Sequence, residues 1–156
     1  MLLARAFLLV TCLATEWALR PWLGLGLASL DLPVLYVLWL AQREPLRCVV
    51  LAGALLCCLR ATFGIDTLVL LVVPLLVSVL VLLLVRRRFN LRELWFQVPW
   101  TAAGMAVFIL IDELLRHRTL AVDFFVAAMG AVIAGLAVPV FFPVLDACLS
   151  PPRATR

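Results

Sequence analysis

The chain has 156 residues, of which 67% are hydrophobic and 14% are charged, and its 13 basic residues are all arginines, which leaves a net charge of +4. Soluble domains carry about 25% charged residues, so a soluble core of this length cannot hide so much apolar surface. The arginines flank apolar runs instead of forming a basic face, which argues against binding to nucleic acid.

We therefore predict an all-α polytopic membrane protein with about six transmembrane helices in a single domain, residues 1–149, followed by a disordered cytoplasmic tail, residues 150–156. Long apolar runs separated by short polar turns mark the helices. The predicted segments are about 2–19, 22–41, 46–60, 67–85, 94–115 and 120–146.

The first segment has Arg5 near its start and an apolar run from Ala6 to Ala14, a pattern that resembles a signal peptide. We interpret it as a retained membrane helix, because no soluble mature domain follows. Glu16 and Arg20 lie four residues apart near its far end, a spacing that predicts an ion pair across one helical turn.

The second segment is the shortest in clean hydrophobicity, with 12 residues from Leu30 to Ala41. It crosses a membrane fully only if the stretch Trp22 to Leu27 contributes to it. Asp31 is the predicted N-cap of its helix, and Pro33 fits the first turn. A third segment follows from Leu46 and ends at an arginine.

The fourth segment contains 18 residues without a formal charge, from Leu68 to Val85, and as a helix it would extend about 27 Å, close to the ~30 Å hydrocarbon core of a bilayer. Ser78, in its middle, is predicted to bond to its own backbone. Arg86, Arg87 and Arg88 end it. We interpret the three arginines as a cytoplasmic topology anchor that binds lipid headgroups, with the docking of an acidic partner as the alternative.

The fifth and sixth segments contain small residues at helix-packing positions. Such residues allow membrane helices to approach closely, so we predict that a partner helix packs here. Pro139 and Pro143 should bend or end the last part of the sixth segment. The residues assigned to partner packing are Gly104, Gly130, Ala134 and Gly135.

Arginines on alternate sides of the six segments are unevenly distributed, nine against four. Basic residues accumulate in cytoplasmic loops, so this bias predicts that both termini are cytoplasmic. The nine are Arg5, Arg43, Arg47, Arg86, Arg87, Arg88, Arg92, Arg153 and Arg156; the four are Arg20, Arg60, Arg116 and Arg118.

A possible polar cluster lies on the outer side, formed by Glu16, Asp112, Glu113 and His117. Ion pairing at a helix end explains it most simply; a proton relay or ligand site and a metal site are the alternatives. The five cysteines lack CxxC spacing and suit apolar packing. Without a nucleophile motif or a second histidine, we expect neither an enzyme nor a cofactor.

Several stretches resemble the rod-shape-determining MreD family. They are the run LDLPVLYVLWLA from Leu30 to Ala41, the short arginine-containing turn after it, Leu46 to Leu59 with its central Gly53, the fourth segment that ends in arginines, and FFPVL from Phe141 to Leu145. The resemblance covers most of the chain.

The resemblance implies a non-enzymatic, multi-pass scaffold in the bacterial inner membrane that belongs to the cell-elongation machinery of peptidoglycan synthesis. Its partner would be the membrane helix of an MreC-like protein in a hetero-oligomer. Through that partner it would connect indirectly to MreB filaments, to the polymerase RodA and to its transpeptidase.

The alternative is the substrate-capturing membrane subunit of a vitamin transporter of the ECF type. Such a subunit would need polar and aromatic groups around a cavity near the outer face. The residues that could supply them are Glu16, Asp31, Trp22, Asp112 and Glu113.

Overall fold

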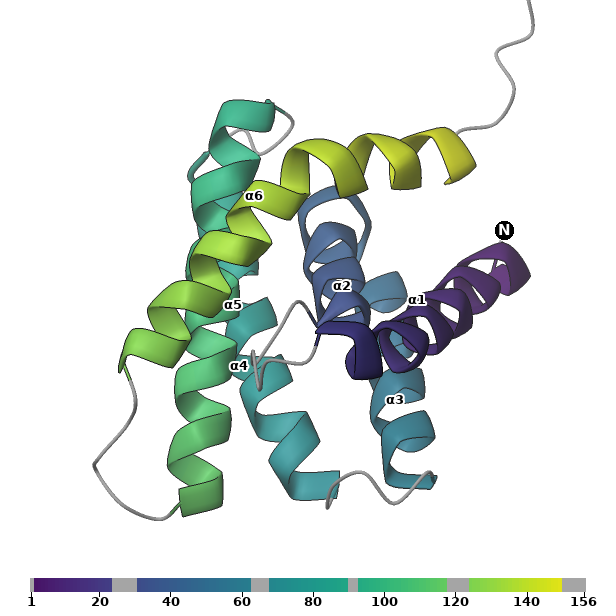
Figure 1. Cartoon of the computed structure of the whole chain (residues 1–156). Coiled ribbons are helices and arrows are strands. Elements are labelled where there is room, and N and C mark those ends of the chain that lie inside the picture. Colours follow the sequence, from purple (N-terminus) through teal and green to yellow (C-terminus); the bar gives the residue numbers. More distant parts are fainter. Residues whose placement is uncertain (1, 24–30, 63–67, 90–92, 118–123, 150–156) are drawn as a thin grey trace, which may run out of the picture.

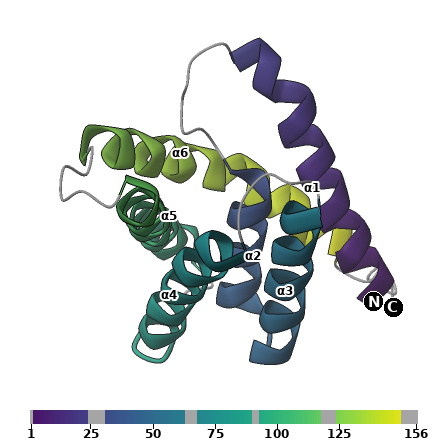
Figure 2. The ribbon, with the colours of Figure 1, turned by 90° about the horizontal axis from the view of Figure 1, so that it is seen from below.

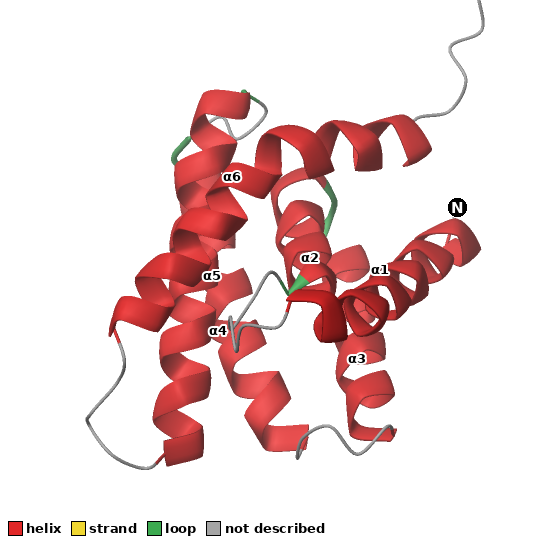
Figure 3. Ribbon diagram, viewed as in Figure 1, coloured by secondary structure: helices red, strands yellow, loops and turns green. Residues whose placement is uncertain are grey.

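A computed structural model describes residues 2–23, 31–62, 68–89, 93–117 and 124–149, and within these ranges it contains helices, turns and short connections but no strand (Figure 3). The all-α prediction is therefore confirmed for the described ranges. The helices are α1 (Leu2–Leu23), α2 (Leu32–Arg43), α3 (Leu46–Thr62), α4 (Leu68–Arg86), α5 (Leu94–His117) and α6 (Phe124–Leu149).

Three of the described helices are long and apolar enough to cross a membrane, judged by length and composition. The qualifying stretches are Leu68–Arg86, Trp95–Arg116 and Ala127–Leu149. Helices α3, α4 and α5 begin and end within two residues of their predicted bounds. The predicted tail, 150–156, and the first residues of the predicted sixth segment lie outside the described ranges.

The short helix α2 forms the centre of the molecule, with the other helices arranged around it (Figures 1 and 2). Every residue from Leu32 to Gln42 is buried. A helix that is apolar on all sides has no face for water and is either enclosed by other helices or surrounded by lipid; α2 is enclosed. Its 12 residues extend about 18 Å, so α2 alone is shorter than the ~30 Å hydrocarbon core of a bilayer.

The boundary between the first two helices differs from the prediction. Trp22 and Leu23, which were assigned to the second segment, belong to the backbone of α1, which continues through Pro21. Proline near a helix end removes only one backbone hydrogen bond, and apolar surroundings favour keeping the others. The beginning of α2 agrees with the prediction: the backbone N–H of Val34 donates to Asp31 Oδ1 at 3.0 Å, and proline lies in the first turn.

Helices α4, α5 and α6 pack side by side, with α5 in contact with both of the others. Close approach depends on glycine, because a Cβ atom added at Gly104 would lie 3.3 Å from Leu82 Cδ1 and 3.6 Å from Leu38 Cδ1. Within α4, Ser78 Oγ donates to the carbonyl oxygen of Pro74 at 2.8 Å, which confirms the predicted backbone bond.

Helix α6 changes direction along its length, running first beside α5 and then across the end of α2 (Figure 1). It remains one helix through Pro139 and Pro143, so the prolines bend it without ending it. Phe142 and Leu145 on its second half are buried. These side chains hold the bent half of α6 against the core.

Candidate functional site

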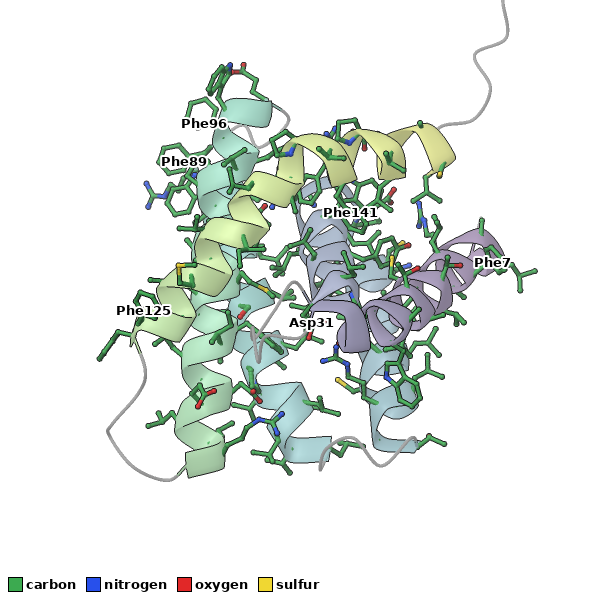
Figure 4. The ribbon with its side chains drawn as sticks, viewed as in Figure 1. Phe7, Asp31, Phe89, Phe96, Phe125 and Phe141 are labelled. Atoms are coloured by element: carbon green, nitrogen blue, oxygen red, sulfur yellow. The ribbon has the colours of Figure 1, made fainter. Side chains whose placement is uncertain are left out.

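Three charged side chains meet in the interior on one side of the molecule, and we call them the Arg60 triad: Arg60, Glu16 and Asp31. Arg60 Nη2 lies 3.1 Å from Glu16 Oε2 and 2.7 Å from Asp31 Oδ2. The three side chains are only 7%, 11% and 14% exposed. Figure 4 shows Asp31 among the helices, in contrast to Phe7, which points away from α1.

Each member of the triad comes from a different helix, and helical periodicity explains how it arrives there. On α3, Arg60 follows the buried residues Val49, Gly53 and Leu56 at spacings of four, three and four. This places the guanidinium on the buried face of α3. Asp31 is fixed because its other carboxylate oxygen caps α2.

The same logic places two charged residues of α1. Arg5 and Glu16 are eleven residues apart, about three helical turns, and the buried Leu9 and Cys12 lie on the face between them. Eleven residues extend about 16 Å, close to the length of α2. Thus one face of α1 reaches both ends of the central helix, with Glu16 at its beginning.

At the other end of α2, Arg5 Nη2 lies 2.8 Å from Glu44 Oε1, and Arg5 Nη1 also donates to the sulfur of Cys48 on α3. The hydroxyl of Tyr36 donates to the backbone carbonyl of Arg5 at 3.2 Å. These contacts bind the start of α1 to α2 and α3.

Two further arginines attach α4 and α6 to this end of α2. Arg86 Nη1 donates to the carbonyl oxygens of Ala41 and Glu44, where the helix has carbonyl groups without helical partners. Arg43 Nη2 lies 2.8 Å from Asp146 Oδ2 of α6. Of the predicted arginine anchor, Arg86 thus caps α2, and all three arginines are exposed.

A buried polar contact also joins α2 to α5. Gln42 Nε2 donates to Thr101 Oγ1 at 2.7 Å, and both residues are buried. Gln42 Oε1 and the nearby Trp39 Nε1 have no hydrogen-bond partner among the described residues. A buried amide and hydroxyl that bond to each other fix the register of the two helices, because sliding would leave both groups unpaired.

The Arg60 triad is suited to holding α1, α2 and α3 together through ion pairs. An arginine that faces two carboxylates keeps its charge and fixes both partners, and removing one partner would leave an uncompensated charge in the interior. Among the described residues, no three His, Cys, Asp or Glu side chains gather in a way that would hold a metal ion.

Comparisons with protein-family models, curated proteins and solved structures find no match to this chain. Inference about function therefore depends on the contacts described here and on the sequence.

The predicted polar outer cluster is divided between separate elements. Glu16 belongs to the Arg60 triad, whereas Asp112 Oδ2 accepts from Arg116 Nε at 2.8 Å within α5. Helix-end ion pairing thus accounts for Asp112. Glu113 is half-buried on α5, and the side chains of His117 and of Arg20, the predicted partner of Glu16, lie outside the described residues.

The small residues assigned to partner packing lie in the interior of the molecule, between its own helices. Gly104 faces α4 and α2, and a Cβ at Gly135 would lie 3.5 Å from Ala102 Cβ of α5. Ala134 is completely buried and Gly130 is buried as well. This chain's own helices therefore cover these residues.

Replacing Gly104 by valine is expected to lower the free energy of unfolding by about 1–3 kcal/mol, because the added atoms overpack a junction of three helices. Leu82 and Leu38, the neighbours, are completely buried and have no space to move into. Denaturant titration in detergent micelles measures the change. Gly135→Ala is the control, since its new Cβ would make ordinary contacts; equal losses in the two variants would contradict the packing described for Gly104.

The sequence contains a signal for the Arg60 triad in the spacing of its charged residues. Arg60 lies in phase with Val49, Gly53 and Leu56, as Glu16 does with Leu9 and Cys12. A charged residue in phase with a buried stripe must find a counterion or be expelled from the interior. In a helix that is apolar on nearly every side, however, the sequence does not show which face is buried. The packing of the helices shows it.

Proposed function

We propose that this protein is a non-enzymatic scaffold of the bacterial inner membrane, with both termini in the cytoplasm, that serves the cell-elongation machinery and holds the transmembrane helix of an MreC-like protein. Contacts with RodA, its transpeptidase and MreB are indirect and pass through that partner. The resemblance to the MreD family motivates the proposal, and the three helices that are long enough to cross a membrane support it.

The observation that carries the proposal is the contrast between the interior and the outer surface. Buried charged groups bind one another, as in the Arg60 triad, and tie the helices into one body. The outer faces are apolar instead. A membrane protein with such a surface acts through helix packing, because packing contacts drive association between helices in lipid.

We place the binding surface for a partner helix on the outer face of α6. Exposed side chains follow one another every fourth residue along it, and ridges with this spacing interlock with the grooves of a second helix. Phe125 also points outward near the start of the helix (Figure 4). We name the part of this surface before the bend of α6 the α6 ridge: Ala128, Val132 and Leu136.

The geometry favours the scaffold over a vitamin-capturing subunit. Two of the carboxylates that a polar pocket would need, Glu16 and Asp31, are bound to Arg60. Two hollows in the described part of the chain, one between α3 and α4 and one among α1, α2 and α3, are lined by apolar side chains, Cys57 and, in the second, Cys48 and Arg5.

Affinity purification from native membranes tests the proposed function. Co-purification of an MreC-like protein supports the scaffold, whereas co-purification of a transporter ATPase module would replace it with the vitamin-capturing alternative. Loss of rod shape on depletion of the protein is a second expected result, since a scaffold of the elongation machinery is needed for growth along the cell axis.

Replacing Val132 and Leu136 together by tryptophan is expected to lower recovery of the MreC-like protein about tenfold or more, because bulky side chains on the α6 ridge prevent close helix approach. Recovered partner per protein is measured by quantitative mass spectrometry. Leu84→Trp on the exposed face of α4 is the control. Equal recovery from the double variant and the control would exclude the α6 ridge as the partner seat.

A further inference from the structure

A lateral groove runs between α3 and α4 on the side of the molecule away from α6 (Figure 2). Its volume is about 370 Å³, within the range of about 300–1,000 Å³ that small-molecule sites occupy. On α3 the lining runs from Leu46 to Cys57, and on α4 from Val72 to Leu83. The lining consists of aliphatic side chains, Gly53 and Cys57, with Val37 of α2 contributing from the centre.

The length of the groove corresponds to one leaflet of a bilayer. Each helix lines it over eleven residue steps, about 16 Å, and half of the ~30 Å hydrocarbon core is about 15 Å. An extended acyl chain of a phospholipid covers the same distance. A whole helix is about 10–12 Å wide with its side chains and is too large for a space of this volume.

Basic residues stand at one end of the groove. Arg47 lies three and seven residues before the lining residues Val50 and Ala54, so it shares their face of α3. Arg87 lies four residues after the lining residue Leu83, in the turn that directly follows the end of α4 at Arg86. Arg47 and Arg87 are both exposed, as is the adjacent Arg88.

These arginines differ from the others at the same end of the molecule. Arg5, Arg43 and Arg86 bind Glu44, Asp146 and backbone carbonyls respectively. For Arg47, Arg87 and Arg88, the described part of the chain supplies no ion pair or hydrogen bond. Three cations without partners among the described residues, beside the mouth of an acyl-sized groove, match the phosphate of an anionic lipid headgroup.

We infer that the groove between α3 and α4 binds one anionic phospholipid, with an acyl chain between the two helices and the headgroup phosphate at Arg47 and Arg87. The inference rests on the membrane location proposed above but not on the MreC-like partner. The α6 ridge lies elsewhere on the molecule, so loss of partner recovery and loss of lipid binding are separate results.

Native mass spectrometry of the purified protein in detergent, titrated with phosphatidylglycerol or with phosphatidylcholine of the same acyl chains, tests the headgroup site. The wild type should bind one phosphatidylglycerol in preference to phosphatidylcholine. Each basic residue near an anionic headgroup contributes about a fivefold gain in affinity, so Arg47→Gln with Arg87→Gln should lose about 25-fold for phosphatidylglycerol. Arg153→Gln with Arg156→Gln removes the same charge and is the control. Equal affinity for the two lipids in the wild type, or equal loss in the two double variants, would overturn the inference.

A second variant tests the acyl site. Ala54 lines the groove from its exposed rim, so Ala54→Phe fills space without entering the core. Ala54→Phe should lower the affinity for both lipids about tenfold, since the phenyl ring takes the place of acyl-chain methylene groups that are buried in the groove. Val73→Phe, exposed on α4 and outside the groove, should leave both affinities unchanged. An equal effect of the two phenylalanines would count against the site.

Photo-crosslinking identifies the occupant in native membranes. With a photoreactive diazirine analogue of leucine in place of Leu80, which lines the groove and is 51% exposed, no space in the groove is lost, and we expect an adduct of phospholipid mass. An adduct to a protein alone would mean that a partner helix occupies this face, and the lipid site would then be rejected.

Discussion

Replacing Arg60 by glutamine is expected to lower the free energy of unfolding by about 3–5 kcal/mol, because two carboxylates then remain in the interior without a counterion. Glu16 and Asp31 are 11% and 14% exposed, so water can compensate little of their charge. Denaturant titration in detergent micelles, followed by circular dichroism, measures the loss. The affected contacts join α1, α2 and α3, so α1 should also become more accessible to protease.

A variant that removes all three charges of the Arg60 triad separates two contributions to the free energy of unfolding. One is the cost of an unpaired buried charge, and the other is the net stabilisation by the ion pairs. Glu16→Gln and Asp31→Asn, added to Arg60→Gln, keep hydrogen-bonding groups at each position, and asparagine can still cap α2. We expect this triple variant to regain more than half of the lost stability. A triple variant less stable than Arg60→Gln alone would contradict the explanation by uncompensated charge.

The exposed pair on α5 is the matched control for this experiment. Arg116 and Asp112 also form an ion pair of 2.8 Å, but the arginine side chain is 38% exposed. Arg116→Gln should therefore cost less than about 1 kcal/mol, as exposed ion pairs generally do. Equal losses at Arg60 and Arg116 would mean that burial does not decide the effect.

The sequence was sufficient to predict the helices themselves and several of their local contacts. Apolar runs set the bounds of α3, α4 and α5, and the Asp31 cap and the Ser78 backbone bond depend on residues four or fewer positions apart. Such contacts obey the geometry of a single helix. No knowledge of neighbouring helices is needed for them.

Contacts between helices could not be predicted from the geometry of a single helix. Arg60 and Glu16 are 44 residues apart, and Arg43 and Asp146 are 103 apart. In a helix that is apolar on nearly every side, periodicity does not distinguish the buried face from the face toward lipid. For the same reason the packing glycines were assigned to a partner, although Gly104 faces α2 and α4 within the chain.

The central position of α2 was not predicted from the sequence, and Tyr36 provides its test. This side chain is completely buried, its ring stacks on Trp39 with centroids 5.9 Å apart, and its hydroxyl reaches the backbone of Arg5. Tyr36→Ala is expected to cost about 3–5 kcal/mol of unfolding free energy, as large aromatic deletions in packed cores do. The cavity would open between α2 and α1, and denaturant titration in micelles measures the loss.

Two further variants show which part of Tyr36 matters. Tyr36→Phe removes only the hydroxyl and should cost about 0.5–1.5 kcal/mol, the net contribution of one hydrogen bond. Phe125→Ala deletes an aromatic ring that is 72% exposed at the start of α6, and should change stability by about 0.5 kcal/mol or less. If α2 instead lay at the periphery, Tyr36→Ala would resemble Phe125→Ala. A large loss at Tyr36 alone therefore identifies the shortest helix as the one against which the others pack.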